Sequence, residues 1–290
     1  MADSVLVDAA QQAGASLGAQ GVDALLLHAP ADLHKPGAHY LKTWLLSLRE
    51  RGLVQRLGVS IYAAEDLEGV DPGLLDLVQL PLSLFDQRLL QDGTLARLRA
   101  AGTSIHPRSL YLQGLLLTPG AKWPPWISTE MRAHQLALEA LSLERGCRLI
   151  DLSLGFARHQ EDLEAVVIGV CSSHELAELS AAWLATPPLQ KIEWGSWALN
   201  DQIFLDPRRW PNLCLLLSSV MYFFQGRETP GSSAINEINR LPILLTIRYC
   251  LCCWNYPLSR DLAQRWLKWA AGRVGVSRAW LIIETGRSLA

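Results

Sequence analysis

The chain has 290 residues, half of which are hydrophobic, and its formal net charge at pH 7 is −2. This size and apolar content predict one large α/β domain, or one domain with an appendage. A charge so close to zero gives no reason to expect nucleic acid or acidic partners. The amino terminus lacks the basic and apolar segments of a secretory signal, and the six cysteines show no paired framework. Both features are typical of a cytoplasmic protein.

Hydrophobic patterning predicts strands and helices that alternate along the chain. Apolar runs that end in polar residues predict strands at 22–28, 54–60, 74–81, 104–109 and 165–169. Apolar residues at helical spacing predict helices at 3–20, 38–51, 64–69, 87–101, 129–145, 149–159 and 173–186. Such alternation is typical of parallel strands joined by right-handed crossovers. No G-x-G-x-x-G turn follows the first strand, and polar residues recur at the strand ends, so a barrel is favoured over a doubly wound nucleotide fold.

The first predicted strand ends in a histidine, His28, followed by Ala29 and Pro30. The carboxyl ends of the strands form the reaction face of a parallel barrel, so His28 is a candidate catalytic residue. The alternative is a structural histidine held by hydrogen bonds, which is the commoner role for a single histidine at the end of an apolar strand.

Several stretches of the chain, taken in order, resemble the aldo-keto reductase family, and its bacterial branch most of all. The stretches are Val22-Asp-Ala-Leu-Leu-Leu-His28, Leu57-Gly-Val-Ser60, Val78-Gln79-Leu-Pro with Phe85-Asp-Gln-Arg88, Arg108-Ser-Leu-Tyr-Leu-Gln-Gly-Leu-Leu116 and Val167-Ile-Gly169. The likeness extends to Leu205-Asp-Pro-Arg-Arg-Trp210, where chains of that branch commonly finish.

This resemblance implies a TIM-type (β/α) barrel that binds NADP(H) at its C-terminal face and reduces a carbonyl with an Asp, a Tyr, a Lys and a His. His28 matches the catalytic histidine. The residues that match cofactor-binding positions are Ser60, Gln79, Ser109, Gly114, Gly169 and Ser172. For each single serine or glycine, turn chemistry is an equal alternative to ligand contact. Cys171 takes the place of a basic residue that often contacts the 2′-phosphate, so NAD stays open beside NADP.

The sequence also departs from the family pattern. By the resemblance, the chain carries five of the eight strands and one of the four catalytic residues, because the family's Asp, Tyr and Lys belong to strands that precede the first match. Arg108 replaces an aromatic residue that often stacks on the nicotinamide. We therefore expect a carbonyl reductase with impaired activity, or else a catalytically inactive reductase-like scaffold or binding module. Loss of a general acid typically lowers a rate by about 10²–10⁴-fold.

The composition changes near residue 210. Residues 211–290 hold nine basic and four acidic residues, whereas residues 1–210 hold 17 basic and 24 acidic residues. Four of the six cysteines also lie in 211–290. This break predicts a reductase-like partial barrel over 1–210 and an unassigned tail over 211–290. The apolar runs 211–224 and 241–254 predict buried or interfacial helices in a mainly helical tail. They fall short of the ~20 residues that span a bilayer, so membrane association is not favoured, and Cys250-Leu-Cys252-Cys253 lacks the second ligand pair of a zinc site.

Five parallel strands cannot close a barrel and would leave two open edges. The first helix, the tail or a second copy of the chain could cover them. Docking of an apolar tail segment on an exposed edge is the simplest arrangement, and self-association is the alternative.

Overall fold

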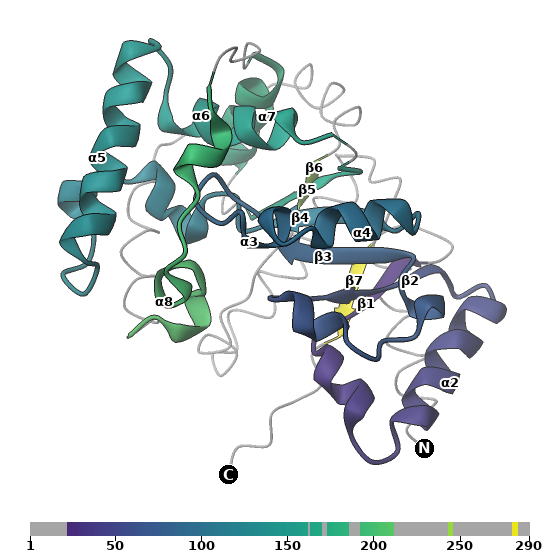
Figure 1. The fold of residues 1–290 in the computed structure, drawn as a ribbon. Coiled ribbons are helices and arrows are strands. Elements are labelled where there is room, and N and C mark those ends of the chain that lie inside the picture. Colours follow the sequence, from purple (N-terminus) through teal and green to yellow (C-terminus); the bar gives the residue numbers. More distant parts are fainter. Residues whose placement is uncertain are drawn as a thin grey trace, which may run out of the picture.

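The computed structural model describes residues 22–161, 163–169, 173–185, 192–211, 243–245 and 280–283. A parallel sheet in the order β4-β3-β2-β1-β7 forms its centre (Figure 1). These strands are β1 (Val22–Leu27), β2 (Val54–Ser60), β3 (Leu77–Pro81), β4 (Ser104–Arg108) and β7 (Trp280–Ile283). A second parallel pair consists of β5 (Val166–Ile168) and β6 (Ile243–Leu245). The Glu164 amide donates to the Ile105 carbonyl at 3.2 Å, so β5 lies beside β4. Strands β1 to β5 together form the wall of the fold.

Helices alternate with β1 to β5, as the sequence predicts. They are α2 (Ala38–Glu50), α3 (Arg88–Gln91), α4 (Thr94–Ala100), α5 (Thr129–Glu144), α6 (Leu149–His159), α7 (Ser173–Ala185) and α8 (Gln202–Leu205). Short 3-10 turns lie between them, including one at Ala64–Leu67 in place of the predicted helix 64–69. The predicted partial parallel (β/α) barrel is thereby confirmed. The predicted helix 3–20 lies outside the described residues.

The predicted helix 87–101 is two helices. Gly93 has a φ of 79°, which is left-handed, and this separates α3 from α4. The Asp92 carboxylate accepts from the Thr94 amide at 2.8 Å and so satisfies a donor at the start of α4. The apolar spacing continues across this break, because Leu89, Leu95 and Leu98 are all buried against the sheet.

Two short strands of the tail lie against the outer strands of the wall. Residues Ala24–Leu27 of β1 pair in parallel with Trp280–Ile283, and Val166–Ile168 of β5 pair with Ile243–Leu245. These pairings place two apolar tail segments along the outer strands β1 and β5. They also correct one expectation: Ile243–Leu245 lies in the run predicted to be helical and forms a strand, because β5 offers it unpaired backbone groups. The remainder of the predicted tail helices lies outside the described residues.

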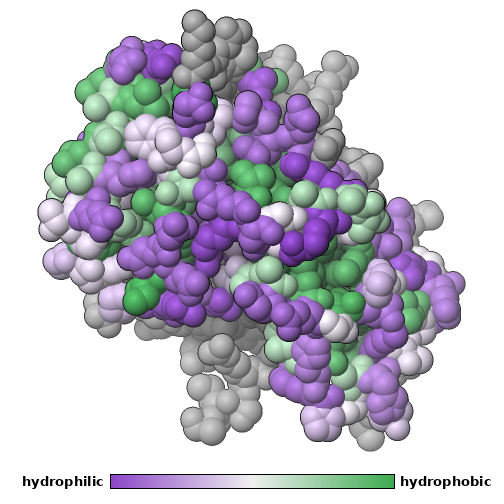
Figure 2. All heavy atoms as spheres, in the orientation of Figure 1, coloured by the Kyte–Doolittle hydropathy of each residue, from purple (hydrophilic) through white to green (hydrophobic). Residues whose placement is uncertain are grey.

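The core lies between the sheet and the helices, with Leu25, Leu57, Val78 and Ile105 at most 1% exposed. Close approach of β2 and β3 depends on Gly58, where an added Cβ would lie 2.3 Å from the Leu77 carbonyl oxygen. Figure 2 shows polar and apolar side chains interspersed on one face of the molecule, with apolar side chains visible between the regions of α2 and α4. Among the described helices, none has the length and apolarity needed to cross a bilayer.

Candidate functional site

The candidate site is the rim formed by the carboxyl ends of β1 to β4. The register pairs Leu27 with Val59, and Ser60 with Gln79. His28, which follows β1 directly, therefore lies at the same edge of the sheet as Ser60. Parallel strands bring residues from distant parts of the sequence together in this way, and ligands of such folds bind there. His28 is half-buried.

Ser60 and Gln79 form a buried polar pair at this rim. Their side chains are 1% and 7% exposed, and Ser60 Oγ lies 3.5 Å from Gln79 Oε1. The Ile61 amide donates to the Gln79 carbonyl at 2.9 Å, so the two strands stay paired up to the rim. A contact of 3.5 Å is at the long limit of a hydrogen bond, so both groups can exchange it for a stronger one with a ligand.

The loop after β4 has an unusual backbone. Ser109, Leu112 and Gln113 have φ values of 63°, 44° and 56°, and Gly114 has a φ of 91°. Left-handed conformations are uncommon for residues other than glycine, and they concentrate at ligand-binding and catalytic sites. β4 ends at Arg108, one residue before the predicted end of the strand at Ser109. Two of the sequence-predicted cofactor residues, Ser109 and Gly114, thus lie in one strained loop beside the rim.

Arg108, the last residue of β4, reaches across the rim. It is 6% exposed, and its Nη2 donates to the Ile61 carbonyl at 2.9 Å. Its Nη1 donates to Ser109 Oγ at 3.4 Å, and its Cζ lies 4.0 Å from the centre of the Tyr62 ring. The guanidinium group is therefore bound to the backbone of Ile61, the residue that follows Ser60 at the end of β2.

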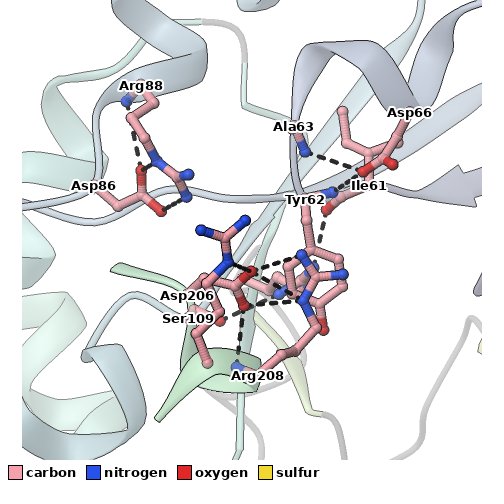
Figure 3. A network of polar contacts seen from close by, with 11 residues as sticks. Ile61, Tyr62, Ala63, Asp66, Asp86, Arg88, Ser109, Asp206 and Arg208 are labelled. Atoms are coloured by element: carbon pink, nitrogen blue, oxygen red, sulfur yellow. Dashed lines mark hydrogen bonds and ion pairs between the residues drawn. The ribbon is translucent and has the colours of Figure 1, made fainter. Parts of the chain in front are cut away.

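A network of charged residues surrounds Tyr62, and Figure 3 shows it from close by. Asp66 accepts from the Tyr62 and Ala63 amides at 2.6 and 3.0 Å, which fixes the loop after β2. Arg208 Cζ lies 3.5 Å from the centre of the Tyr62 ring, and Arg208 is paired in bidentate fashion with Asp206. Burial opposes ionisation of Asp206, but the hydrogen bonds from Arg208 outweigh it and lower the pKa of the Asp206 carboxyl.

This network was not predicted from the sequence. Leu205–Trp210 and Phe85–Arg88 carry part of the family resemblance, and both stretches also hold a buried aspartate paired with an arginine two residues later. The repeated Asp-x-Arg spacing was the available signal. The stacking of Arg208 on Tyr62 left no such signal, because the two residues are far apart in the chain.

The remaining predicted cofactor positions follow β5. Gly169 is exposed and directly follows Ile168. Ser172 lies outside the described residues, so its predicted role stays a prediction. Among the described residues, no group of three or more His, Cys, Asp or Glu side chains is arranged to hold a metal ion.

A second charged cluster links residues near the amino ends of β1 and β2 to His106, which the register pairs with Gln79. Arg56 on β2 is 2.7 Å from both Asp23 on β1 and Glu164 before β5, and Glu164 is 3.3 Å from His106 on β4. Burial opposes ionisation of Glu164, but Arg56 and Ser104 outweigh it and lower the pKa of Glu164 to about 2. Burial lowers the pKa of His106 to about 4, against the attraction of Glu164. A neutral His106 therefore links β4 to a charged Glu164.

Comparison with known proteins supports the fold. No family model and no curated protein matches the sequence. Solved structures do match: the apo form of the aldo-keto reductase AKR11C1 from Bacillus halodurans has a TM-score of 0.52 at 18% identity, over 71% of this chain and 73% of that chain. The holo form of the same enzyme has a TM-score of 0.51 at 18% identity, over 70% and 71%. The resemblance seen in the sequence is confirmed at the level of structure, and the chain has the fold of the aldo-keto reductases.

Proposed function

We propose that the chain is an oxidoreductase of the aldo-keto reductase type, which binds NADPH or NADH at the rim of β1 to β4 and reduces a small aldehyde or ketone, such as a sugar-derived carbonyl. The observation that carries the proposal is the buried Ser60–Gln79 pair at the carboxyl ends of two paired strands. A hydroxyl group and a side-chain amide together offer both donors and acceptors, which suits the carboxamide of a nicotinamide.

The other residues of the site fit the same ligand. Ser109 and Gly114 lie in the strained loop beside the pair and are assigned to the pyrophosphate side of the cofactor, with Gly169 and Ser172 completing that side after β5. When bound, the reduced nicotinamide supplies a hydride. His28 is assigned to orient and polarise the carbonyl, because an imidazole at the strand end can donate a hydrogen bond to the oxygen as charge develops on it.

A second candidate is a catalytically inactive, reductase-like binding module. The stacking around Tyr62 favours it. Tyr62 lies two residues after the end of β2, and its ring is held between Arg108 and Arg208. A site without a positioned acid would bind the cofactor and turn over slowly. In either case we assign the reductase-like body to residues 1–210, keep 211–290 as a separate segment of unassigned role, and expect a cytoplasmic protein without a nucleic-acid partner.

The test is a titration of the purified full-length chain with NADPH, followed by cofactor fluorescence. We expect saturable binding, weakened on the order of threefold to tenfold by Ser60→Ala or Gln79→Ala, because each removes one hydrogen bond. Thr43→Ala, at an exposed position on α2, is the matched control and should bind like the parent. Absence of binding at millimolar NADPH would reject the reductase and the cofactor-binding module, and would leave an inactive reductase-like scaffold.

Turnover separates the two candidates. NADPH oxidation is measured with a panel of aldehydes, ketones and sugar-derived carbonyls, using the same protein preparation. Oxidation that depends on the carbonyl supports the reductase, whereas saturable binding without turnover supports the binding module. His28→Gln should lower the turnover number with little change in NADPH affinity, because the imidazole is assigned to the carbonyl and not to the cofactor.

A further inference from the structure

The guanidinium of Arg108 is hydrogen-bonded to the backbone that follows Ser60. Its Nη2 donates to the carbonyl of Ile61, the residue after Ser60, and the Ile61 amide donates to the Gln79 carbonyl, both at 2.9 Å. The register pairs Arg108 with Pro81, two residues beyond Gln79 on the same strand. The cation is therefore fixed to the backbone that carries the two residues of the proposed nicotinamide site.

Several contacts hold this guanidinium in place. The Tyr62 ring lies 4.0 Å from its Cζ, the Ser109 hydroxyl lies 3.4 Å from Nη1, and only 6% of the residue is exposed. Tyr62 itself is held by the two hydrogen bonds from the loop backbone to Asp66. A charge fixed at a buried position acts on its neighbours more strongly than a mobile surface charge, because water screens it less.

We propose that Arg108 sets the preference of this site between the two redox forms of the cofactor, in favour of the reduced one. The reduced dihydronicotinamide ring is neutral and the oxidised ring carries a positive charge, so a fixed cation repels only the oxidised form. This inference rests on the proposed function. For two unit charges separated by several ångströms at a buried rim, the expected difference in affinity is on the order of tenfold.

This preference has a consequence for the reaction. Hydride transfer breaks a C–H bond of the reduced ring and forms one at the carbonyl carbon, while the carbonyl oxygen gains the π electron pair and takes a proton from solvent water. The ring becomes positively charged in that step, so repulsion by Arg108 appears only after transfer. It weakens retention of the oxidised cofactor and, by linkage, raises the reduction potential of the bound couple.

The test compares the dissociation constants of NADPH and NADP⁺ by isothermal titration calorimetry on the full chain. The parent should bind NADPH on the order of tenfold more tightly than NADP⁺. Arg108→Gln, which keeps a hydrogen-bond donor and removes the charge, should reduce that ratio several-fold, and Arg108→Lys should retain most of it. Arg97→Gln on α4, a change of the same kind away from the rim, should leave the ratio unchanged.

Two results would overturn the inference while leaving the proposed function in place. One is a parent that binds both redox forms equally. The other is an Arg108→Gln variant that keeps the full ratio. If Arg108→Gln does not fold, the ratio of the two dissociation constants in the parent and in Arg108→Lys still tests the inference. A lysine at this position keeps the charge, so loss of the preference in Arg108→Lys would also contradict a charge effect. Failure of the parent to bind either form overturns the proposed function as well.

Discussion

At the scale of single residues, the structure distinguishes two histidines that look alike in the sequence. His28 follows its strand and lies half-buried at the rim, whereas His106 lies within β4 and is 1% exposed. His28 follows the end of its strand, where ligands of this type of fold bind. His106 joins the cluster of Asp23, Arg56 and Glu164, where its contribution is to stability.

This cluster predicts a loss of stability in acid. The pKa of His106 falls to about 4 in the folded chain, below its ordinary value near 6.5, so the unfolded chain binds an extra proton between these values. Stability is therefore fully present above about pH 6.5 and declines as the pH falls toward 4, by about 3 kcal/mol in all. The pKa of Glu164, about 2, adds a further decline below about pH 4.5.

Urea unfolding of the full chain at a series of pH values measures this decline. His106→Gln should flatten the curve between pH 6.5 and 4, since glutamine does not titrate. The exposed His39 on α2 provides the control, and His39→Gln should leave the curve as it is in the parent. An unchanged slope in His106→Gln would contradict the assignment.

At the scale of elements, the spacing between β2 and β3 positions the Ser60–Gln79 pair. Gly58 lies two residues before Ser60, and its lack of a side chain lets the Leu77 backbone approach. A wider gap here would separate the two side chains at the rim. The geometry of the site therefore depends on a glycine that contacts no ligand.

Gly58→Ala should destabilise the fold by about 2 kcal/mol or more, because a Cβ at 2.3 Å from a backbone oxygen forces the two strands apart. NADPH binding should weaken as well. In Gly195→Ala the added Cβ has no atom within 4 Å, so the free energy of unfolding should change by less than about 0.5 kcal/mol. Equal effects of the two substitutions on the urea midpoint would show that β2 and β3 tolerate the extra carbon.

At the scale of the whole molecule, the tail completes the wall of the fold. Strands β6 and β7 pair with β5 and β1, the two outer strands of the family-like region. An edge strand exposes a row of unpaired amides and carbonyls that promotes association between chains. Both edges are covered here from within the same chain, although the sequence gives no resemblance to the family beyond Trp210.

Deleting residues 212–290 should expose both edges and cause self-association. The expected result is a shift to larger species in size-exclusion chromatography with light scattering. Deleting only 284–290 leaves both strands present and serves as the control. A truncated chain that stays monomeric and keeps its urea midpoint would show that the tail strands contribute nothing to the wall.

Much of this architecture could be predicted from the sequence, because apolar runs and helical spacing set the alternation of β1 to β5 with their helices. The Asp92-Gly93 pair indicates the break between α3 and α4, but the leucine spacing on either side of it predicts one continuous helix. The strands of the tail were not predictable in the same way. A short apolar run such as Ile243–Leu245 suits a helix or a strand equally well, and the available edge of β5 decides between them.

The candidate site, too, could be predicted only in part from the sequence. Ser60, Gln79 and Ser109 could be proposed from the sequence because each follows or ends a strand. The contacts of Arg108 with Ile61 and Tyr62 could not, since a sequence does not reveal which way a long side chain turns at the end of a strand. The left-handed conformations of Leu112 and Gln113 were equally hidden, because neither residue type favours them.

The pairing of β7 with β1 also dictates an order of events on the ribosome. β1 is synthesised well before its partner Trp280–Ile283. Until Trp280–Ile283 emerges, the nascent chain presents one side of β1 without its neighbour, and a contact between such distant residues forms slowly once both are present. Chaperones that hold extended apolar segments should engage this chain during synthesis and release it only after Trp280–Ile283 has emerged.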